Sequence, residues 1–185
     1  VAPFARVQSM DEFAVALGTV GLPAIVKTAA FGYDGKGQHR IESIERAEAV
    51  WGVVGHQEAI LERLIDFSCE ISVVAARGLD GVVVDHGAIE NRHVNHVLDL
   101  SLSPARVPAA IAAEASLLTR RIMEDLGYVG VLCVEFFVTR DQRLVVNEIA
   151  PRPHNSGHYT IDACVTSQFE QQARVLAGMP LGDTR

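Results

Sequence analysis

Apolar, β-rich runs follow one another along this chain with only turn residues between them, and the helical patterns are separate from them. The runs cover residues 59–65, 69–77, 81–89, 129–138 and 143–149. Residues 106–126 carry apolar side chains at intervals of three or four and stop at Gly127, which predicts a helix. Strands that come in hairpins, with separate helices, favour an α+β fold with mostly antiparallel sheets over a doubly wound parallel sheet.

The first forty residues predict a helix followed by a hairpin. Ser9 is a candidate N-cap for a helix over residues 9–20, and Glu12 completes a capping box. The run "AIVK" (24–27) enters a glycine-rich stretch as a strand, and "GQHRI" (37–41) leaves it as another. Strand, loop and strand make a hairpin flap rather than the strand-to-helix turn of a dinucleotide site. Further helices are predicted over residues 43–55 and from about 167 to 176.

The flap between these two strands is costly in conformational entropy. Its residues include Gly32, Tyr33, Asp34, Gly35, Lys36 and Gly37. A glycine cluster indicates unusual backbone angles or a close approach to a ligand, because glycine loses the most backbone freedom on folding. Backbone N–H groups in such a loop can cradle a phosphate, and Lys27 at its entrance can supply a point charge. The likeness to a P-loop is loose, because no Ser or Thr follows the flap lysine.

Composition narrows the class of protein. The 185 residues suffice for one sizeable domain or two small lobes, and the net charge of −7 argues against nucleic acid as a partner. The chain has neither an 18-residue apolar run nor a signal-peptide pattern, so a membrane is not expected. Its three cysteines are far apart, which fits reduced thiols and a cytoplasmic protein. The chain begins at Val1 rather than at an initiator methionine, so we expect a piece of a longer protein.

Two glutamates interrupt the apolar strands late in the chain. Alternation places Glu135 on one face of its strand, and Leu144, Val146 and Glu148 together on one face of the next. If residues 141–142 form a two-residue hairpin turn, Glu135 lies opposite Glu148. Opposed carboxylates about 5 Å apart repel by about 3 kcal/mol at an effective dielectric of about 20, so the pair must share a proton or a cation. The alternative is a three-residue loop, which would offset the pair by one position.

Oxygen-only ligands indicate Mg²⁺ or Mn²⁺, and Mg²⁺ held by one or two carboxylates usually also binds substrate phosphates. Directly after Glu148, the stretch "RPHNSGH" (152–158) forms a polar, cation-bearing loop where an anionic substrate could bind. Its histidines His154 and His158 have the spacing of a helical zinc pair, but the prolines and glycine around them disfavour a helix. The cluster "ENRHVNH" (90–96) is expected to be a solvated loop.

A lysine that ends a strand, a glycine flap and two late acidic strands together resemble the ATP-grasp superfamily. Several sequence segments resemble those of the 5-(carboxyamino)imidazole ribonucleotide synthase family of purine biosynthesis. They are "IVK…GYDGKGQ", "LER" followed by "CEISVVAARG", "ENRH", "LGYVGVLCVEFF" and "NEIAPRPHNSGHYT". The resemblance covers nearly the whole chain, and "NEIAPRPHNSGH" is its most discriminating part. It implies a two-lobed ATP-grasp fold, with a small lobe of about residues 1–62 and a large lobe of about 63–185. The family's N-terminal substrate domain and its C-terminal domain would be absent.

The resemblance also implies an activity. An ATP-dependent ligase of this family carboxylates 5-aminoimidazole ribonucleotide with bicarbonate by way of carboxyphosphate, using ATP and Mg²⁺, with Mn²⁺ as a substitute. The implied partners are these small molecules, and a homodimeric parent protein is compatible with the sequence. Two alternatives stay open: another ATP-grasp carboxylate–amine ligase, or a nucleotide-binding fragment without turnover.

Residue roles can be carried over from the family in the same way. Positions that resemble its nucleotide site are Lys27, Gly32, Gly35, Lys36, Gly37, Gln38, Glu62, Arg63, Leu64, Ile65, Glu70, Asn147 and Glu148. Positions that resemble its bicarbonate and ribonucleotide site are Tyr33, Asp34, Arg152, His154, Asn155 and Ser156. The implied metal ligands are Glu135 and Glu148, and Asp34 is the implied general base. The roles of Glu90 and His93 are left open.

Overall fold

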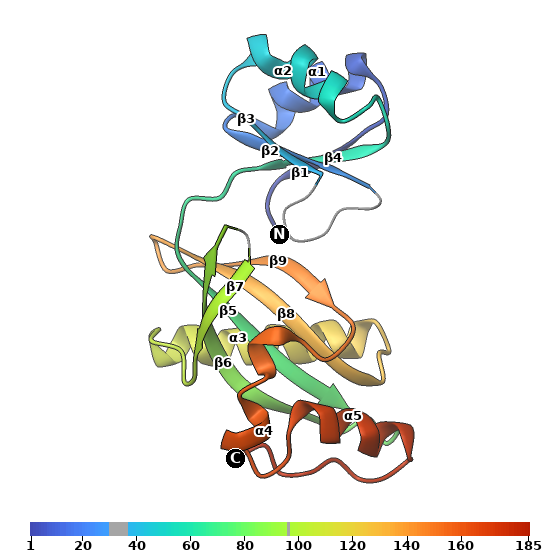
Figure 1. Ribbon diagram of the computed structural model, residues 1–185, viewed down its shortest axis with the longest axis vertical. Coiled ribbons are helices and arrows are strands. Elements are labelled where there is room, and N and C mark those ends of the chain that lie inside the picture. Colours follow the sequence, from blue (N-terminus) through green and yellow to red (C-terminus); the bar gives the residue numbers. More distant parts are fainter. Residues whose placement is uncertain (30–36, 96) are drawn as a thin grey trace. The chain divides into compact units, whose positions relative to one another are not determined.

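The computed structural model describes residues 1–29, 37–95 and 97–185. The chain divides into two compact units, Val1–Asp66 and Phe67–Arg185, each built on its own antiparallel sheet (Figure 1). The predicted α+β class, with mostly antiparallel sheets, is confirmed. No helix among the described residues is both long and apolar enough to cross a membrane.

The first unit has a four-stranded sheet in the order β1-β4-β2-β3, with two helices. Its elements are β1 (Phe4–Val7), α1 (Met10–Val20), β2 (Ala24–Thr28), β3 (Gln38–Ile41), a 3₁₀ turn (Ile44–Arg46), α2 (Ala47–Val53) and β4 (Ala59–Arg63). The predicted strand–flap–strand hairpin is confirmed, because β2 and β3 pair with Lys27 opposite Gln38. Residues 30–36 of the flap lie outside the described residues.

Helix α1 begins where the capping pattern predicted. The Ser9 hydroxyl accepts a hydrogen bond from the Glu12 N–H at 3.2 Å, and the Glu12 carboxylate accepts one from the Gln8 N–H at 2.8 Å. In a standard capping box the second bond would come from the N–H of Ser9, so this cap reaches one residue further back. Gly21, with φ +82°, ends the helix.

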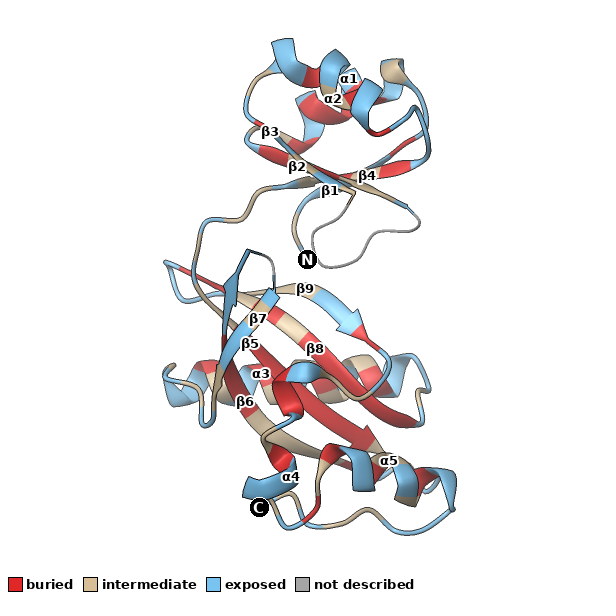
Figure 2. Cartoon of the chain, in the orientation of Figure 1, coloured by how far each residue is buried: buried red, intermediate tan, exposed pale blue. Residues whose placement is uncertain are grey.

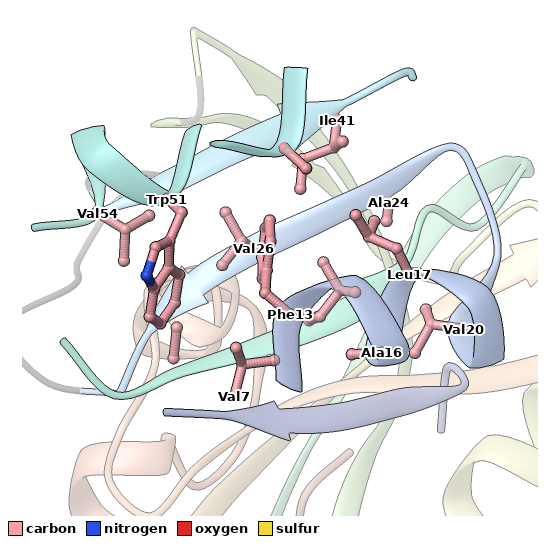
Figure 3. Packing of buried hydrophobic residues seen from close by; sticks show 13 residues of the cluster. Val7, Phe13, Ala16, Leu17, Val20, Ala24, Val26, Ile41, Trp51 and Val54 are labelled. Carbon is pink, nitrogen blue, oxygen red and sulfur yellow. The ribbon is translucent and has the colours of Figure 1, made fainter. Parts of the chain in front are cut away.

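Both helices of the first unit bury their apolar sides against one face of its sheet (Figure 3). The rings of Phe13 on α1 and Trp51 on α2 lie 5.3 Å apart in this core. Val26 on β2 and Leu61 on β4 are fully buried in it. Side chains alternate along a strand, so their neighbours Lys27 and Glu62 belong to the opposite face of the sheet.

The second unit has a five-stranded sheet in the order β7-β6-β5-β8-β9. Its elements are β5 (Phe67–Arg77), β6 (Val83–Val94), β7 (Val97–Leu102), α3 (Ala109–Asp125), β8 (Gly130–Thr139), β9 (Leu144–Ala150), a 3₁₀ turn (Asn155–Gly157), α4 (Thr160–Ala163) and α5 (Gln168–Leu176). Buried residues run along its central strands (Figure 2). The expected solvated loop at 90–96 is wrong for residues 90–94, which continue β6.

The two faces of this sheet have different cores. One face packs against α3 and includes Ile71, Val73, Phe136, Leu144 and Val146. The other face is smaller and packs against residues of the C-terminal segment; it includes Val74, Ala76, Ile89, Val131, Cys133 and Ala150. Because side chains alternate, the residues that continue this second face along each strand can be assigned to it, and these are the polar residues described below.

The hairpin of β8 and β9 corrects the predicted turn. The Thr139 N–H donates to the Arg143 carbonyl at 2.9 Å, which closes a three-residue loop rather than a two-residue turn at residues 141–142. Gln142 takes a positive φ of 60°, as the last residue of such a loop commonly does. A bulge then leaves Asn147 without a cross-strand partner, between the pairs Phe136–Val146 and Glu135–Glu148.

Candidate functional site

One face of the second unit's sheet carries a row of polar side chains across its strands. Ser101 pairs with Asn91, and Asn91 pairs with Glu70. Two residues further along β5, Ser72 pairs with Glu135, and Glu135 pairs with Glu148. The row continues the face of Val74, Cys133 and Ala150, so one sheet face changes from apolar to strongly polar along its strands.

The predicted opposition of Glu135 and Glu148 is confirmed. The prediction that Leu144, Val146 and Glu148 share a face is wrong, because Leu144 and Val146 pack on the α3 side. The bulge at Asn147 returns Glu148 to the face of Glu135. A β-bulge beside a candidate site is a common way to redirect a side chain.

Glu135 is bound to the loop that follows β9. The Nε2 atom of His154 lies 3.0 Å from Oε1 of Glu135. Burial acts to raise the pKa of Glu135, but the hydrogen bond from His154 and the nearby positive side chains outweigh it, and the pKa is lowered. The lowered pKa keeps this carboxylate charged, which argues against a proton shared with Glu148.

Glu70 forms a second carboxylate–imidazole pair on the same face. Its Oε2 atom lies 2.5 Å from Nδ1 of His93 on β6. Burial raises the pKa of Glu70, His93 opposes that shift, and the negative charge of Glu135 adds to it. The site therefore brings together Glu70 and Glu135, which repel one another and each pair with a histidine.

The residues present fit a magnesium ion bound through two carboxylates. Glu148 is exposed, and the bond from His154 uses only the Oε1 atom of Glu135. Across the described ranges, no three His, Cys, Asp or Glu side chains are grouped as a metal site. An ion here would need further oxygen ligands, and phosphate oxygens commonly complete such a two-carboxylate magnesium site.

The loop after β9 separates the two histidines considered as a zinc pair. His154 faces Glu135, whereas the ring of His158 stacks on Phe169 at 5.8 Å. A zinc site formed by these two residues is therefore not supported. Arg152 and Asn155 are exposed, and the guanidinium of Arg152 donates to the carbonyl of Pro153 at 3.0 Å.

Gln168, a residue that sequence reasoning missed, holds this loop in place. Its side-chain Oε1 accepts from the His154 N–H at 2.8 Å, and its Nε2 donates to the His154 carbonyl at 2.7 Å. Gln168 is fully buried. A Cβ at Gly157 would lie only 2.7 Å from the Gln168 amide, so glycine is required there by close approach.

A hollow of about 330 Å³ lies between β7 and this loop. Asp99 and Ser101 line it from the strand, and Asn155, His158 and Tyr159 line it from the loop side. Ser101 thus belongs both to the hollow and to the polar row. The predicted substrate residue Asn155 is exposed at its edge.

Two of the predicted nucleotide residues of the first unit form an ion pair with each other. Nζ of Lys27 donates to Oε2 of Glu62 at 2.7 Å. The Arg63 N–H donates to the Pro3 carbonyl at 2.9 Å, and the Leu64 N–H donates to the Pro23 carbonyl at 3.0 Å. Ile65 follows in the segment after β4.

The flap residues can be placed only in part. Gly37 has a φ of +75°, and its carbonyl accepts from the Thr28 N–H at 3.0 Å, next to the exposed Gln38. Outside the described residues lie the predicted flap residues Gly32, Tyr33, Asp34, Gly35 and Lys36.

Glu90, whose role was left open, has a structural partner. Its two carboxylate oxygens bind the guanidinium of Arg106 at 2.9 and 2.6 Å. The hydrogen bonds from Arg106 lower the pKa of Glu90, and burial opposes that shift. Glu90 pairs with Ile71 and so lies on the face of α3, away from the polar row.

Ser72 and Asn91 were also missed by sequence reasoning. Both are buried, at 0% and 5% exposure. The available signal was alternation, because Ser72 precedes the apolar run Val73–Ala76 and is in phase with Val74. Their partnership with Ser156 and Ser101 depends on strand pairing that a single sequence does not specify.

Comparison with known proteins shows the family to which this chain belongs. Residues 1–169 match the ATP-grasp domain family, and the chain belongs to that family. The fold described above is the ATP-grasp fold, with its two antiparallel sheets.

Individual proteins that resemble this chain belong to a narrower group within the family. The chain is 44% identical over 184 residues to the N5-carboxyaminoimidazole ribonucleotide synthase of Bacillus subtilis, with 100% of the chain and 48% of that protein covered. A solved structure described as the ADP complex of an N5-carboxyaminoimidazole ribonucleotide synthetase matches with a TM-score of 0.94 at 39% identity, covering 100% of the chain and 49% of its own.

A third match is the N5-carboxyaminoimidazole synthase of Aspergillus clavatus in complex with ADP and 5-aminoimidazole ribonucleotide, with a TM-score of 0.89 at 26% identity. It covers 98% of the chain and 48% of its own. The chain therefore spans about half the length of each of these three relatives.

Proposed function

We propose that this chain is the ATP-grasp part of a 5-(carboxyamino)imidazole ribonucleotide synthase. The parent protein would use ATP to join bicarbonate to the exocyclic amine of 5-aminoimidazole ribonucleotide, in purine biosynthesis. The observation that carries the proposal is the opposed pair Glu135 and Glu148, placed beside the histidine-bearing loop of "NEIAPRPHNSGH". The names of the matched relatives support the same activity.

The reaction divides into two transfers. Bicarbonate attacks the γ-phosphate of ATP and gives carboxyphosphate and ADP, and the carboxyl group then passes to the amine with release of phosphate. Mg²⁺, when bound, would supply positive charge against the phosphate oxygens, as phosphoryl transfer generally requires. Glu135 and Glu148 are the residues that would hold it. Asn147, at the bulge, is proposed to lie next to the nucleotide.

Other residues of this chain bind and orient. Lys27 would exchange its bond to Glu62 for a phosphate oxygen, because an anionic phosphate competes with the carboxylate for the same ammonium group. The other nucleotide residues are proposed to be Gly32, Gly35, Lys36, Gly37, Gln38, Glu62, Arg63, Leu64, Ile65 and Glu70. The substrate residues are proposed to be Tyr33, Asp34, Arg152, His154 and Asn155, with Asp34 as general base near the amine.

The test is ADP release by the full-length parent protein. With MgATP, release should require bicarbonate and aminoimidazole ribonucleotide together, and the carboxylated ribonucleotide should appear in step with ADP. A screen of other carboxylate and amine pairs is the control. If another pair supports faster release and this pair does not, the protein is a different ATP-grasp ligase.

The same assay on the isolated chain addresses the second alternative. ATP affinity and ADP formation would be measured on one preparation. Binding without turnover in the chain, together with turnover in the parent, would assign this chain as the nucleotide-binding part. Absence of binding in both would contradict the proposal.

A further inference from the structure

A chain of hydrogen bonds crosses the sheet of the second unit and ends at Glu135. It starts at Ser101, whose hydroxyl donates to Oδ1 of Asn91 at 3.0 Å. Nδ2 of Asn91 donates to the Ser72 hydroxyl at 2.8 Å. The Ser72 hydroxyl lies 2.8 Å from that of Ser156 and donates to it.

The number of hydroxyl protons available determines which ring nitrogen of His154 carries the proton. A serine hydroxyl has one proton, so when Ser72 donates to Ser156, Ser156 must direct its own proton elsewhere. Nδ1 of His154 lies 2.9 Å from the Ser156 hydroxyl, much closer than the Cys133 Sγ at 3.9 Å, and the Ser156 backbone N–H also points at Nδ1, at 3.3 Å. Nδ1 therefore acts as an acceptor. A neutral imidazole with a bare Nδ1 carries its proton on Nε2, which faces Glu135.

The chain could run in the opposite direction only at a cost. In that case Nδ1 of His154 would carry the proton and donate to Ser156. Its proton would then meet the backbone N–H of Ser156, whose direction is fixed by the main chain. A bare Nε2 would also face the Glu135 carboxylate, so two acceptors would meet at 3.0 Å. Both ends of His154 select the direction that leads to Glu135.

We propose that Asn91, Ser72 and Ser156 are positioning residues, which fix His154 as an Nε2–H donor to Glu135 and so hold the carboxylate of the proposed metal site. This assignment rests on the proposed function only for the use of Glu135. It also gives Ser156 a different role from the substrate contact that the family resemblance implied.

Burial favours one single pattern of donors and acceptors in this series of hydrogen bonds. Ser72 and Ser156 are fully buried, so water does not replace a lost partner. An unmade hydrogen bond at such a site leaves a desolvated polar group, which favours one complete pattern over several partial ones. Partners that orient a metal ligand commonly affect metal affinity without touching the metal.

The first test measures the tautomer directly in the isolated chain. Long-range ¹⁵N–¹H spectra of histidine side chains at neutral pH would be assigned with His154→Gln. The expected result is a ring that is protonated at Nε2 and bare at Nδ1, and Ser156→Ala should keep this tautomer, because its backbone N–H and Glu135 are unchanged. A ring protonated at Nδ1 in wild type would overturn the assignment.

The second test compares Ser72→Ala with Thr119→Val. Thr119 is an equally buried hydroxyl on α3 that bonds to its own helix at 2.9 Å, outside the chain described here. At one fixed ATP concentration, the Mg²⁺ concentration for half-maximal thermal stabilisation should rise about tenfold in Ser72→Ala and stay unchanged in Thr119→Val. Equal midpoints in Ser72→Ala and wild type would overturn the positioning role.

The two tests separate the possible failures. If wild type shows no magnesium-dependent stabilisation, the proposed function fails, while the tautomer still decides the hydrogen-bond chain. If Ser72→Ala does not fold, the magnesium midpoint of Ser156→Ala decides the positioning role by the same criterion, because this variant removes the hydroxyl that contacts Nδ1 of His154.

Discussion

Glu135 on β8 and Glu148 on β9 lie directly opposite one another, although the loop that joins their strands has one residue more than a two-residue turn. The longer loop shifts the pairing by one position, and the bulge at Asn147 shifts it back. Two departures from a regular hairpin thus cancel at this pair. An arrangement that brings like charges together needs a reason, and a shared cation supplies one.

Cys133 should be chemically inert in the folded protein. It is fully buried, and burial, aided by the charge of Glu135, raises its pKa to about 12. Thiols react as thiolates, so at about pH 8 an alkylating reagent should modify the less buried Cys69 and Cys164 well before it. Mass spectrometry of the native and the urea-denatured chain measures the order. Early native labelling of Cys133 would contradict the burial and the neutral thiol.

The contact between Gly157 and Gln168 should be visible as coupling between two mutations. Gly157→Ala is expected to lower the free energy of unfolding by about 1–3 kcal/mol, because the added methyl group meets a fully buried amide that is bonded at both ends. Gln168→Ala should also destabilise, since the His154 N–H and carbonyl lose their partner.

In the double variant the alanine at 157 should cost much less, because the clashing side chain is gone. Urea unfolding of the four proteins gives the coupling. Strictly additive losses would show that the two side chains do not compete for this space.

The ion pair of Glu90 and Arg106 predicts a pH dependence of stability. The folded-state pKa of Glu90 lies below its ordinary value of 4.5, chiefly because Arg106 hydrogen-bonds to the charged form. A depressed carboxyl pKa contributes stability above pH 4.5, which is lost as the pH falls through the folded-state value. Glu90→Gln should therefore melt several degrees below wild type at neutral pH, and the difference should shrink below pH 4.5.

A suitable control is Glu170→Gln, which removes an exposed pair with Arg174 four residues along α5. Exposed pairs of this kind contribute little, so its melting temperature should stay near that of wild type at every pH. If the gap between Glu90→Gln and wild type is unchanged in acid, the pair is not the source of the stability.

Local patterns predicted much of the fold. Ser9 caps α1 as predicted, α5 begins beside Ser167 where the last helix was expected, and alternating apolar residues mark the central strands. The strands β1 and β7 were missed because they are short, largely exposed edge strands, whose residues need not alternate in polarity. The polar run that begins at Glu90 was also missed as the end of strand β6. Its backbone pairs with β5 and β7, and a single sequence does not show this pairing.

The site was predictable to the extent that its residues are unusual for their position. Two glutamates on apolar strands stand out in any sequence. Ser72 and Gln168 do not, because a single buried polar residue is informative only once its partner is known. The bulge at Asn147 was not foreseeable either, and the predicted opposition of Glu135 and Glu148 was correct although its assumed two-residue turn was wrong.

The central claim is that Glu135 and Glu148 together bind the magnesium that accompanies ATP. Glu148→Gln removes a like charge and a ligand in one step. Without ligand the variant should melt no lower than wild type, because the repulsion across the hairpin is relieved. A suitable control is Glu124→Gln, which makes the same charge change at an exposed position on α3.

The most direct measurement is the melting temperature with ATP, with and without Mg²⁺, for wild type and both variants. At a MgATP concentration about 100 times its dissociation constant, wild type and Glu124→Gln should gain about 2.7 kcal/mol of stability that depends on magnesium. Glu148→Gln should lose most of this gain while keeping its melting temperature without ligand. A full magnesium-dependent shift in Glu148→Gln would contradict the paired-carboxylate site.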